Sequence, residues 1–192
     1  MAHQIKRLMR DTSSDLLTGE VIMDESYFGG LEENMHKAKK EKLIKARGGK
    51  KRGVGGSNKT TVFAMMDKRG LKIVAKIVDT DKVNSSVLRQ IINKHVDKDA
   101  VVVTDGHKAY NGLDKVYAQH EVVNHRQHEY VRNGYTTNYI ENYWSTLKRM
   151  IKGTHIHVSK EYLPLYINEN TFRYIYRKQP AQMLDIILNQ IV

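Results

Sequence analysis

The architecture of this chain can be worked out from the stretch Glu20-Val-Ile-Met-Asp-Glu-Ser-Tyr-Phe28. Its apolar and β-branched residues predict a strand, and Asp24 stands inside that strand beside Glu25. A carboxylate buried in an apolar strand costs a few kcal/mol unless it is paired or bound to a metal. Alternation places Asp24 and Glu25 on opposite faces of the strand, so at most one of them joins a site directly. Burial and alternation alone leave open whether Asp24 or Glu25 does so.

Two further acidic residues stand where a metal-dependent nuclease needs them. Asp105 closes a second strand-like run, Ala100-Val-Val-Val-Thr-Asp-Gly106, and Glu141 lies in the helix-like run Thr137-Asn-Tyr-Ile-Glu-Asn-Tyr-Trp-Ser-Thr-Leu-Lys-Arg149. Taken singly, Asp105 could be a turn former and Glu141 a solvated surface residue. Taken together, two strand carboxylates and one helix carboxylate can hold two divalent cations and so activate an attacking oxygen at a phosphodiester.

Composition indicates a polyanion as the partner. The chain has 192 residues, enough for one domain, with 32 Lys and Arg against 21 Asp and Glu, a formal net charge of +11. That excess favours nucleic acid through counterion release, although charge alone does not separate DNA from RNA or from an anionic membrane. The absence of cysteine excludes disulfides, thiolate zinc sites and cysteine nucleophiles. No apolar run approaches the ~20 residues of a membrane span, and the start lacks the apolar core of a signal peptide, so we expect a soluble cytoplasmic protein without a membrane partner.

The order of the expected elements is three strands, a helix, a strand, a helix, a strand and then helices. Their ranges are 20–28, Thr60–Lys68, Leu71–Asp79, Asn84–Val96, 100–105, Lys108–Leu113, Glu121–Asn124, Asn138–Lys152, 159–177 and Pro180–Ile191. That order matches the ribonuclease-H-like fold, an α/β fold whose mixed β-sheet begins with three antiparallel strands and is flanked by α-helices. Its acidic positions are the middle of the first strand, the end of the fourth and a late helix, which are the places of Asp24, Asp105 and Glu141.

Six segments then occur in order with the spacing of a known family. They are Val21-Ile-Met-Asp-Glu-Ser-Tyr-Phe-Gly-Gly30, Thr104-Asp-Gly-His-Lys-Ala-Tyr-Asn-Gly-Leu113, Glu121-Val-Val-Asn-His125, the Thr137–Arg149 run, Lys152-Gly-Thr-His-Ile-His-Val-Ser159 and Phe172-Arg-Tyr174. They resemble the successive motifs of the ISXO2-like transposases, a bacterial insertion-sequence family with a DDE catalytic domain. The resemblance runs from about residue 19 to residue 178. It divides the chain into an N-terminal helix and connector (1–19), a catalytic domain (20–178) and a C-terminal helix (179–192).

The resemblance implies Mg²⁺-dependent cleavage at element ends and transfer of the freed 3′-hydroxyl into target DNA, with Mn²⁺ expected to substitute for Mg²⁺. Carried over residue by residue, Asp24, Asp105 and Glu141 are the catalytic metal ligands. Asn142 is a competing third ligand, because some relatives use Asn there. The implied partners are inverted-repeat ends, target DNA and a second copy or more of the chain on that DNA, at the bacterial nucleoid.

Two groups of cations are expected to hold DNA phosphates. The first is a basic, glycine-containing loop over residues 31–58, which follows the catalytic strand directly and whose glycine content predicts mobility at least in its second half. The second is the pair Lys148 and Arg149 on the Glu141 helix. The cations of the loop are Lys37, Lys39, Lys40, Lys42, Lys45, Arg47, Lys50, Lys51 and Arg52. A solvated insertion without DNA contact is the alternative for this loop.

Nearby aromatic residues allow two interpretations. They are Tyr135, Tyr139, Tyr143 and Trp144. Such side chains among cations can stack on unpaired bases near a cleavage point, or they can be ordinary core packing.

Two alternatives to an active transposase remain. Family members often carry a zinc-ribbon-like module before this domain, and only 19 residues precede it in this sequence. A truncated or domesticated remnant that binds nucleic acid without catalysis is therefore the first alternative. The second is a ribonuclease-H-like nuclease, which shares the fold and the metals, although the motifs around Asp105 and Glu141 follow the transposase pattern.

Overall fold

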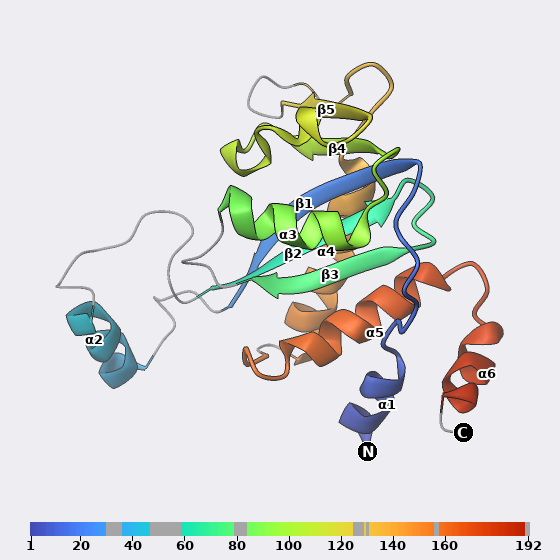
Figure 1. The fold of residues 1–192 in the computed structure, drawn as a ribbon. Helices are drawn as coiled ribbons and strands as arrows, with labels where there is room; N and C mark the ends of the chain where they lie inside the picture. Colours follow the sequence, from blue (N-terminus) through green and yellow to red (C-terminus); the bar gives the residue numbers. More distant parts are fainter. Residues whose placement is uncertain are drawn as a thin grey trace.

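A computed structural model of the chain describes residues 1–29, 36–46, 59–78, 84–124, 129, 131–155 and 158–190. Within these residues five strands form one mixed sheet in the order β3-β2-β1-β4-β5 (Figure 1). The strands are β1 (Glu20–Phe28), β2 (Thr60–Asp67), β3 (Ile73–Val78), β4 (Val101–Asp105) and β5 (Gln119–Val123). β1, β2 and β3 are antiparallel neighbours, whereas β4 pairs parallel with both β1 and β5. The predicted α/β class, with its antiparallel start, is confirmed.

Alternating side chains of the strands build a hydrophobic core on each face of the sheet. On one face, Val21 and Met23 pack with Leu88 and Ile92 of α3 (Ser85–His95). That helix begins where its sequence predicts, because the side chain of Asn84 accepts a hydrogen bond from the backbone nitrogen of Val87 at 3.0 Å. Strand β1 therefore runs through the middle of the molecule with one core on either side.

The opposite face of the sheet is covered by α4 (Asn138–Met150) and α5 (Leu163–Ile175). Figure 1 shows α3 in front of the sheet and α4 behind it. The long helix was expected to reach Lys152. Its α-helical part ends at Met150 and continues as the π-helical turn η6 (Ile151–His155). The remaining elements are α1 (Ala2–Leu8), the short 3₁₀ turns η3 (Lys108–Tyr110) and η4 (Leu113–Lys115), and α6 (Gln182–Asn189).

The interpretation of residues 31–58 as a loop is wrong for its middle part, which forms α2 (Lys37–Ala46). The glycine density that predicted a loop begins only after this segment, and Ala, Lys, Glu and Leu all favour helix. Figure 1 shows α2 standing apart from the sheet. The glycine-rich second half of the predicted loop lies outside the described residues.

In the described part of the chain, none of the helices has both the length and the apolar character needed to cross a membrane.

Candidate active site

Asp24 and Asp105 belong to neighbouring parallel strands. In the ladder between β1 and β4, Ile22 pairs with Val103, an offset of 81 residues that holds along the whole ladder. Asp24 and Asp105 have the same offset and lie two residues beyond that last pair. Since side chains alternate along a strand, both carboxylates point to the same face of the sheet. The two strands carry them where their hydrogen-bonded pairing has just ended.

Helix α4 packs on the face of the sheet to which Asp24 points, and it supplies a hydrogen-bond donor to this carboxylate. The indole nitrogen of Trp144 donates a hydrogen bond to Oδ2 of Asp24 at 3.0 Å. Trp144 is buried, and its ring packs against Tyr143 and Phe28 with ring centroids 5.1 Å and 6.0 Å away. A buried indole needs a partner for its N–H, so the same contact satisfies the tryptophan and orients the carboxylate.

Glu25 points to the other face of the strand. The hydroxyl of Tyr110, in η3, donates to Oε2 of Glu25, and Nδ1 of His107 lies 3.9 Å from Oε1. The side chain of Glu25 is only 7% exposed. His107, which lies beside Glu25, also contacts Asp105: its backbone nitrogen donates a hydrogen bond to Oδ1 of Asp105 at 2.9 Å.

Burial, together with the charges of neighbouring carboxylates, raises the pKa of Asp24 and of Glu25. Burial is the largest cause that raises the pKa of Asp24 to about 7, and the charges of Glu25 and Asp105 add to it. Burial also raises the pKa of Glu25 to about 7; the hydrogen bond from Tyr110 opposes this shift and the charge of Asp105 adds to it. Each group is therefore far easier to protonate than an exposed carboxyl, and a cation placed among them would favour their charged forms.

Glu141 faces the same space as Asp24. Both line an open cleft of about 700 Å³ between β1, α4 and η6, together with Trp144, Ser145 and Lys148 of α4. The Glu141 carboxylate accepts a hydrogen bond from the hydroxyl of Thr137 at 3.0 Å, one turn earlier. We name this space the carboxylate cleft. Glu25 also lines it, although its carboxylate is bound to Tyr110 on the other face of β1, so the expectation that at most one of the two acidic neighbours joins the site directly stays a prediction.

The three predicted ligands are not drawn into a closed triad. Asp24 and Asp105 interact electrostatically, and Asp24 and Glu141 share the cleft. Yet among the described residues no three acidic or histidine side chains are close enough to hold a metal ion jointly. The alternative third ligand, Asn142, is directed elsewhere: its Oδ1 accepts a hydrogen bond from the hydroxyl of Tyr174 at 3.2 Å.

The donor set nevertheless suits a hard divalent cation. Asp24, Asp105 and Glu141 offer carboxylate oxygens only, which are the ligands that Mg²⁺ prefers. Asp24 and its neighbour Glu25, whose pKa values are raised, are the carboxyls whose repulsion such a cation would relieve.

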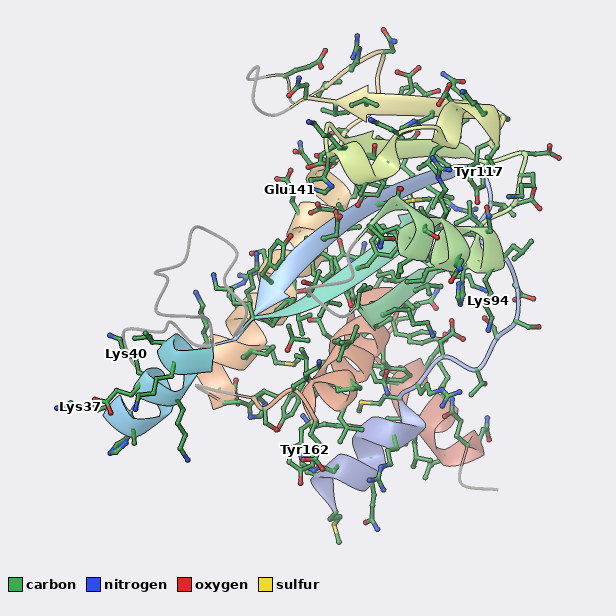
Figure 2. All side chains as sticks on the ribbon, turned by 60° about the vertical axis from the view of Figure 1, so that its left-hand side comes forward. Lys37, Lys40, Lys94, Tyr117, Glu141 and Tyr162 are labelled. Carbon is green, nitrogen blue, oxygen red and sulfur yellow. The ribbon has the colours of Figure 1, made fainter. Side chains whose placement is uncertain are left out.

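The predicted DNA-binding residues fall into two places. Lys148 and Arg149 line the carboxylate cleft, as does Lys152, which is not among the DNA-binding residues predicted from the sequence. Lys37, Lys40, Lys42 and Lys45 lie on α2, and Figure 2 shows Lys37 and Lys40 projecting from that helix away from the sheet. Arg47, Lys50, Lys51 and Arg52 lie outside the described residues, as does the side chain of Lys39.

The aromatic residues differ in burial, and base stacking by an exposed one stays a prediction. Tyr143 and Trp144 are buried in the core, whereas Tyr139 is 41% exposed. The role of Trp144 as a donor to Asp24 was missed, because nothing local links two residues 120 positions apart. The lysine spacing could have pointed to Lys152, which follows Lys148 by one helical turn.

Comparison with known proteins agrees with this geometry. The family model of the ISXO2-like transposase domain matches residues 16–174, a range that includes Asp24, Asp105 and Glu141. A relative from Haemophilus influenzae, named an uncharacterized transposase-like protein, is 30% identical over 122 residues, which are 64% of this chain and 96% of the relative. The resemblance drawn from the six sequence motifs is confirmed.

Proposed function

We propose that this chain, which belongs to the ISXO2-like transposase family, cleaves DNA at the ends of an insertion sequence and joins the freed 3′-hydroxyl to target DNA. The observation that carries the proposal is the gathering of carboxylates around one cleft. Asp24 and Asp105 share one face of neighbouring strands, and Glu141 lines the cleft with Asp24. Buried carboxylates with mutual repulsion are costly to a fold, so their presence here is better explained by chemistry than by stability.

Asp24, Asp105 and Glu141 are the residues that would hold Mg²⁺, or Mn²⁺ in its place. When bound, such ions stabilise negative charge at the reacting phosphate and promote deprotonation of the attacking hydroxyl or water. The protein contributes a fixed position for each carboxylate. The two strands determine the separation of Asp24 and Asp105, and the indole of Trp144 orients Asp24.

Cations on the cleft would hold the DNA backbone beside the carboxylates. Lys148, Arg149 and Lys152 line the cleft on the side of α4 and η6, and Lys148 and Lys152 are exposed. Such contacts neutralise phosphates without reading the base sequence, so they position the strand and contribute affinity that falls with salt. The lysines of α2 extend the same role, and a second copy of the chain on the DNA would serve the second element end.

The decisive experiment is a cleavage and strand-transfer assay of the wild type and Asp105→Asn with Mg²⁺ or Mn²⁺. The substrates are duplexes bearing the inverted repeats, nicked and hairpin forms, and an RNA–DNA hybrid. We expect Asp105→Asn to lose 3′-end cleavage about a thousand-fold or more, because several kcal/mol of charge stabilisation disappear. Its affinity for DNA should be equal or slightly higher, since a negative charge near the phosphates has gone.

Lys148→Ala is the matched control. It should bind DNA more weakly and retain cleavage at saturating DNA. Full cleavage by Asp105→Asn would refute the assignment of the carboxylates. A wild type that binds the repeats and never cuts them would instead identify a binding remnant, and cleavage confined to the RNA strand of the hybrid would identify a ribonuclease.

A further inference from the structure

A second hollow, of about 430 Å³, lies where the turn between β2 and β3 meets the start of α4 and the end of α5. We name it the basic pocket. Its polar lining consists of Lys68, Arg69, Tyr139, Tyr174, Arg177 and Lys178. No residue of the carboxylate cleft is among them, and neither is an acidic side chain.

The β2–β3 turn, which forms one wall of the pocket, is stabilised by hydrogen bonds to a side chain within it. The carboxylate of Asp67 accepts hydrogen bonds from the backbone nitrogens of Leu71 and Lys72, at 2.8 and 3.1 Å. Gly70 has a φ of +65°, and a Cβ there would lie only 3.2 Å from the ring of Tyr174 and 3.3 Å from the guanidinium of Arg177. Glycine therefore allows the turn to approach the end of α5 closely, which brings Lys68 and Arg69 next to the cations of that helix end.

On the opposite wall, a cation–π contact with Tyr174 positions the side chain of Arg177. The guanidinium of Arg177 lies over the ring of Tyr174, 4.1 Å from its centroid, and also donates to the Tyr174 carbonyl oxygen. The hydroxyl of Tyr174 shares its proton between Oδ1 of Asn142 and the carbonyl oxygen of Tyr139, 3.3 Å away. A guanidinium held over an aromatic ring is already positioned, so it loses little freedom when its remaining N–H groups bind an anion.

Only part of the positive charge of the pocket is offset by neighbouring carboxylates. Lys68 donates to Glu20 at 2.7 Å, and Arg69 lies 3.6 Å from Asp67. For Arg177 and Lys178, in contrast, no ion pair is found within the described residues. These two exposed cations leave the pocket with excess positive charge beside tyrosine rings, a combination that suits a phosphodiester with its sugar.

The position of the pocket relative to the carboxylate cleft follows from α4. Tyr139 lines the basic pocket and Glu141 the cleft, two residues apart in the first turn. Two residues correspond to about 200° around a helix, so the two spaces open on opposite sides of α4. DNA that touches both must pass the start of this helix.

We infer that the basic pocket binds the phosphodiester backbone of DNA at a second point, separate from the strand at the carboxylates. The inference rests on the proposed function, because it takes DNA as the ligand. It adds a DNA contact built from the β2–β3 turn and the end of α5, whose cations are not among those that the sequence predicts to bind DNA.

The test is DNA binding by the full chain with Ca²⁺ in place of Mg²⁺, measured over a range of salt concentrations. The variant Arg177→Gln/Lys178→Gln is compared with Lys94→Gln/Lys115→Gln, which removes the same charge from exposed positions outside both spaces. Lys94 lies on α3, across the sheet from α4 (Figure 2). We expect the pocket variant to lose about ten-fold in affinity near 0.1 M salt. Its plot of log affinity against log salt should be shallower by about 1 to 2, whereas the control should stay near wild type.

A second double variant tests whether a loss of affinity comes from misfolding. Arg69→Gln/Lys178→Gln leaves the stack of Arg177 on Tyr174 intact and should show the same loss of affinity at an unchanged melting temperature.

Equal behaviour of the pocket and control variants overturns the inference. Inorganic phosphate supplies a second arm: if it raises the melting temperature of the wild type and of neither pocket variant, while DNA affinity stays the same, the pocket is a small-anion site. Failure of the wild type to bind DNA at all would instead defeat the proposed function. The two failures are therefore distinguishable.

Discussion

Asp24 and Glu25 are neighbours on one strand, carry the same charge and have pKa values raised to about the same value, yet they lie in different surroundings. Asp24 faces α4, receives the indole N–H of Trp144 and shares its face of the sheet with Asp105. Glu25 faces the side of α3 and is tied to the hydroxyl of Tyr110. A raised pKa thus marks both residues and distinguishes neither.

Asp24 and Glu25 differ in what their hydrogen-bond donors do. An indole N–H occupies one oxygen of Asp24 and leaves the carboxylate beside the cleft and its cations. The tyrosine hydroxyl anchors Glu25 to a turn that follows β4, next to the core of the α3 face. We therefore propose that Asp24 takes part in the chemistry and that Glu25 ties β1 to the turn that follows β4. Four experiments can test that division.

The largest expected contrast is in cleavage. Asp24→Asn should reduce cleavage about a thousand-fold or more through loss of a metal ligand, whereas Glu25→Gln keeps a hydrogen-bond acceptor for Tyr110 and should cost about ten-fold or less. Single-turnover rates on pre-bound DNA measure both. Comparable losses in the two variants would mean that Glu25 also acts directly in the reaction.

The next largest contrast is expected when the hydrogen-bond donors of the two carboxylates are removed. Trp144→Phe removes the N–H that orients Asp24 and should slow cleavage about ten- to a hundred-fold, as loss of a partner of a metal ligand does. Tyr110→Phe should act mainly on stability, at about 1–3 kcal/mol, since it leaves a buried carboxyl without its donor. Urea unfolding beside single-turnover kinetics separates the two effects. A Trp144→Phe enzyme of normal rate would show that the indole only fills the core.

Metal should stabilise the fold through Asp24 more than through Glu25. At about ten times its dissociation constant, Mn²⁺ should add about 1.4 kcal/mol, or roughly 3–6 °C in melting temperature. Asp24→Asn, Asp105→Asn and Glu141→Gln should each lose the response, and Glu25→Gln should keep it. A wild type whose melting is indifferent to millimolar Mn²⁺ would count heavily against the site.

The smallest contrast is expected in the pH dependence of stability without metal. Both carboxyls have a folded-state pKa near 7, above the ordinary values of 3.8 and 4.5, so the folded protein binds more protons than the unfolded chain between these limits. Stability should therefore fall as the pH rises from about 4 to about 7 and level off above. Asp24→Asn and Glu25→Gln should each flatten this decline and be more stable than wild type at pH 8. Unfolding by urea at several pH values measures the slope, and a wild type that gains stability across this window would contradict the buried positions of both groups.

Much of this site follows from local sequence patterns. Alternating apolar residues predicted the strands of Asp24 and Asp105, and helical periodicity predicted α3 and α4, because these signals depend on near neighbours along the chain. The face of α4 that carries Glu141 and Lys148 was also predictable, since residues seven apart on a helix return to the same side. The motifs indicated the family, which the comparison confirmed.

Local signals misled where composition changed within one segment. Residues 31–58 are rich in both glycine and lysine when taken as a whole, and this average composition predicts one basic loop. The glycine-free part, Lys37–Ala46, forms α2. Helix propensity acts over about ten residues, so the average over a longer window concealed it.

What the chain specifies through its neighbours is the set of elements and the positions of the carboxylates along them. The partners of those carboxylates depend on contacts between remote segments: Trp144 reaches Asp24 across 120 positions, and Tyr110 reaches Glu25 across 85. The basic pocket likewise exists only because Gly70 lets a hairpin turn meet the end of α5. Such contacts arise from strand register and from the packing of helices on the sheet, and neither is encoded in any short stretch of residues.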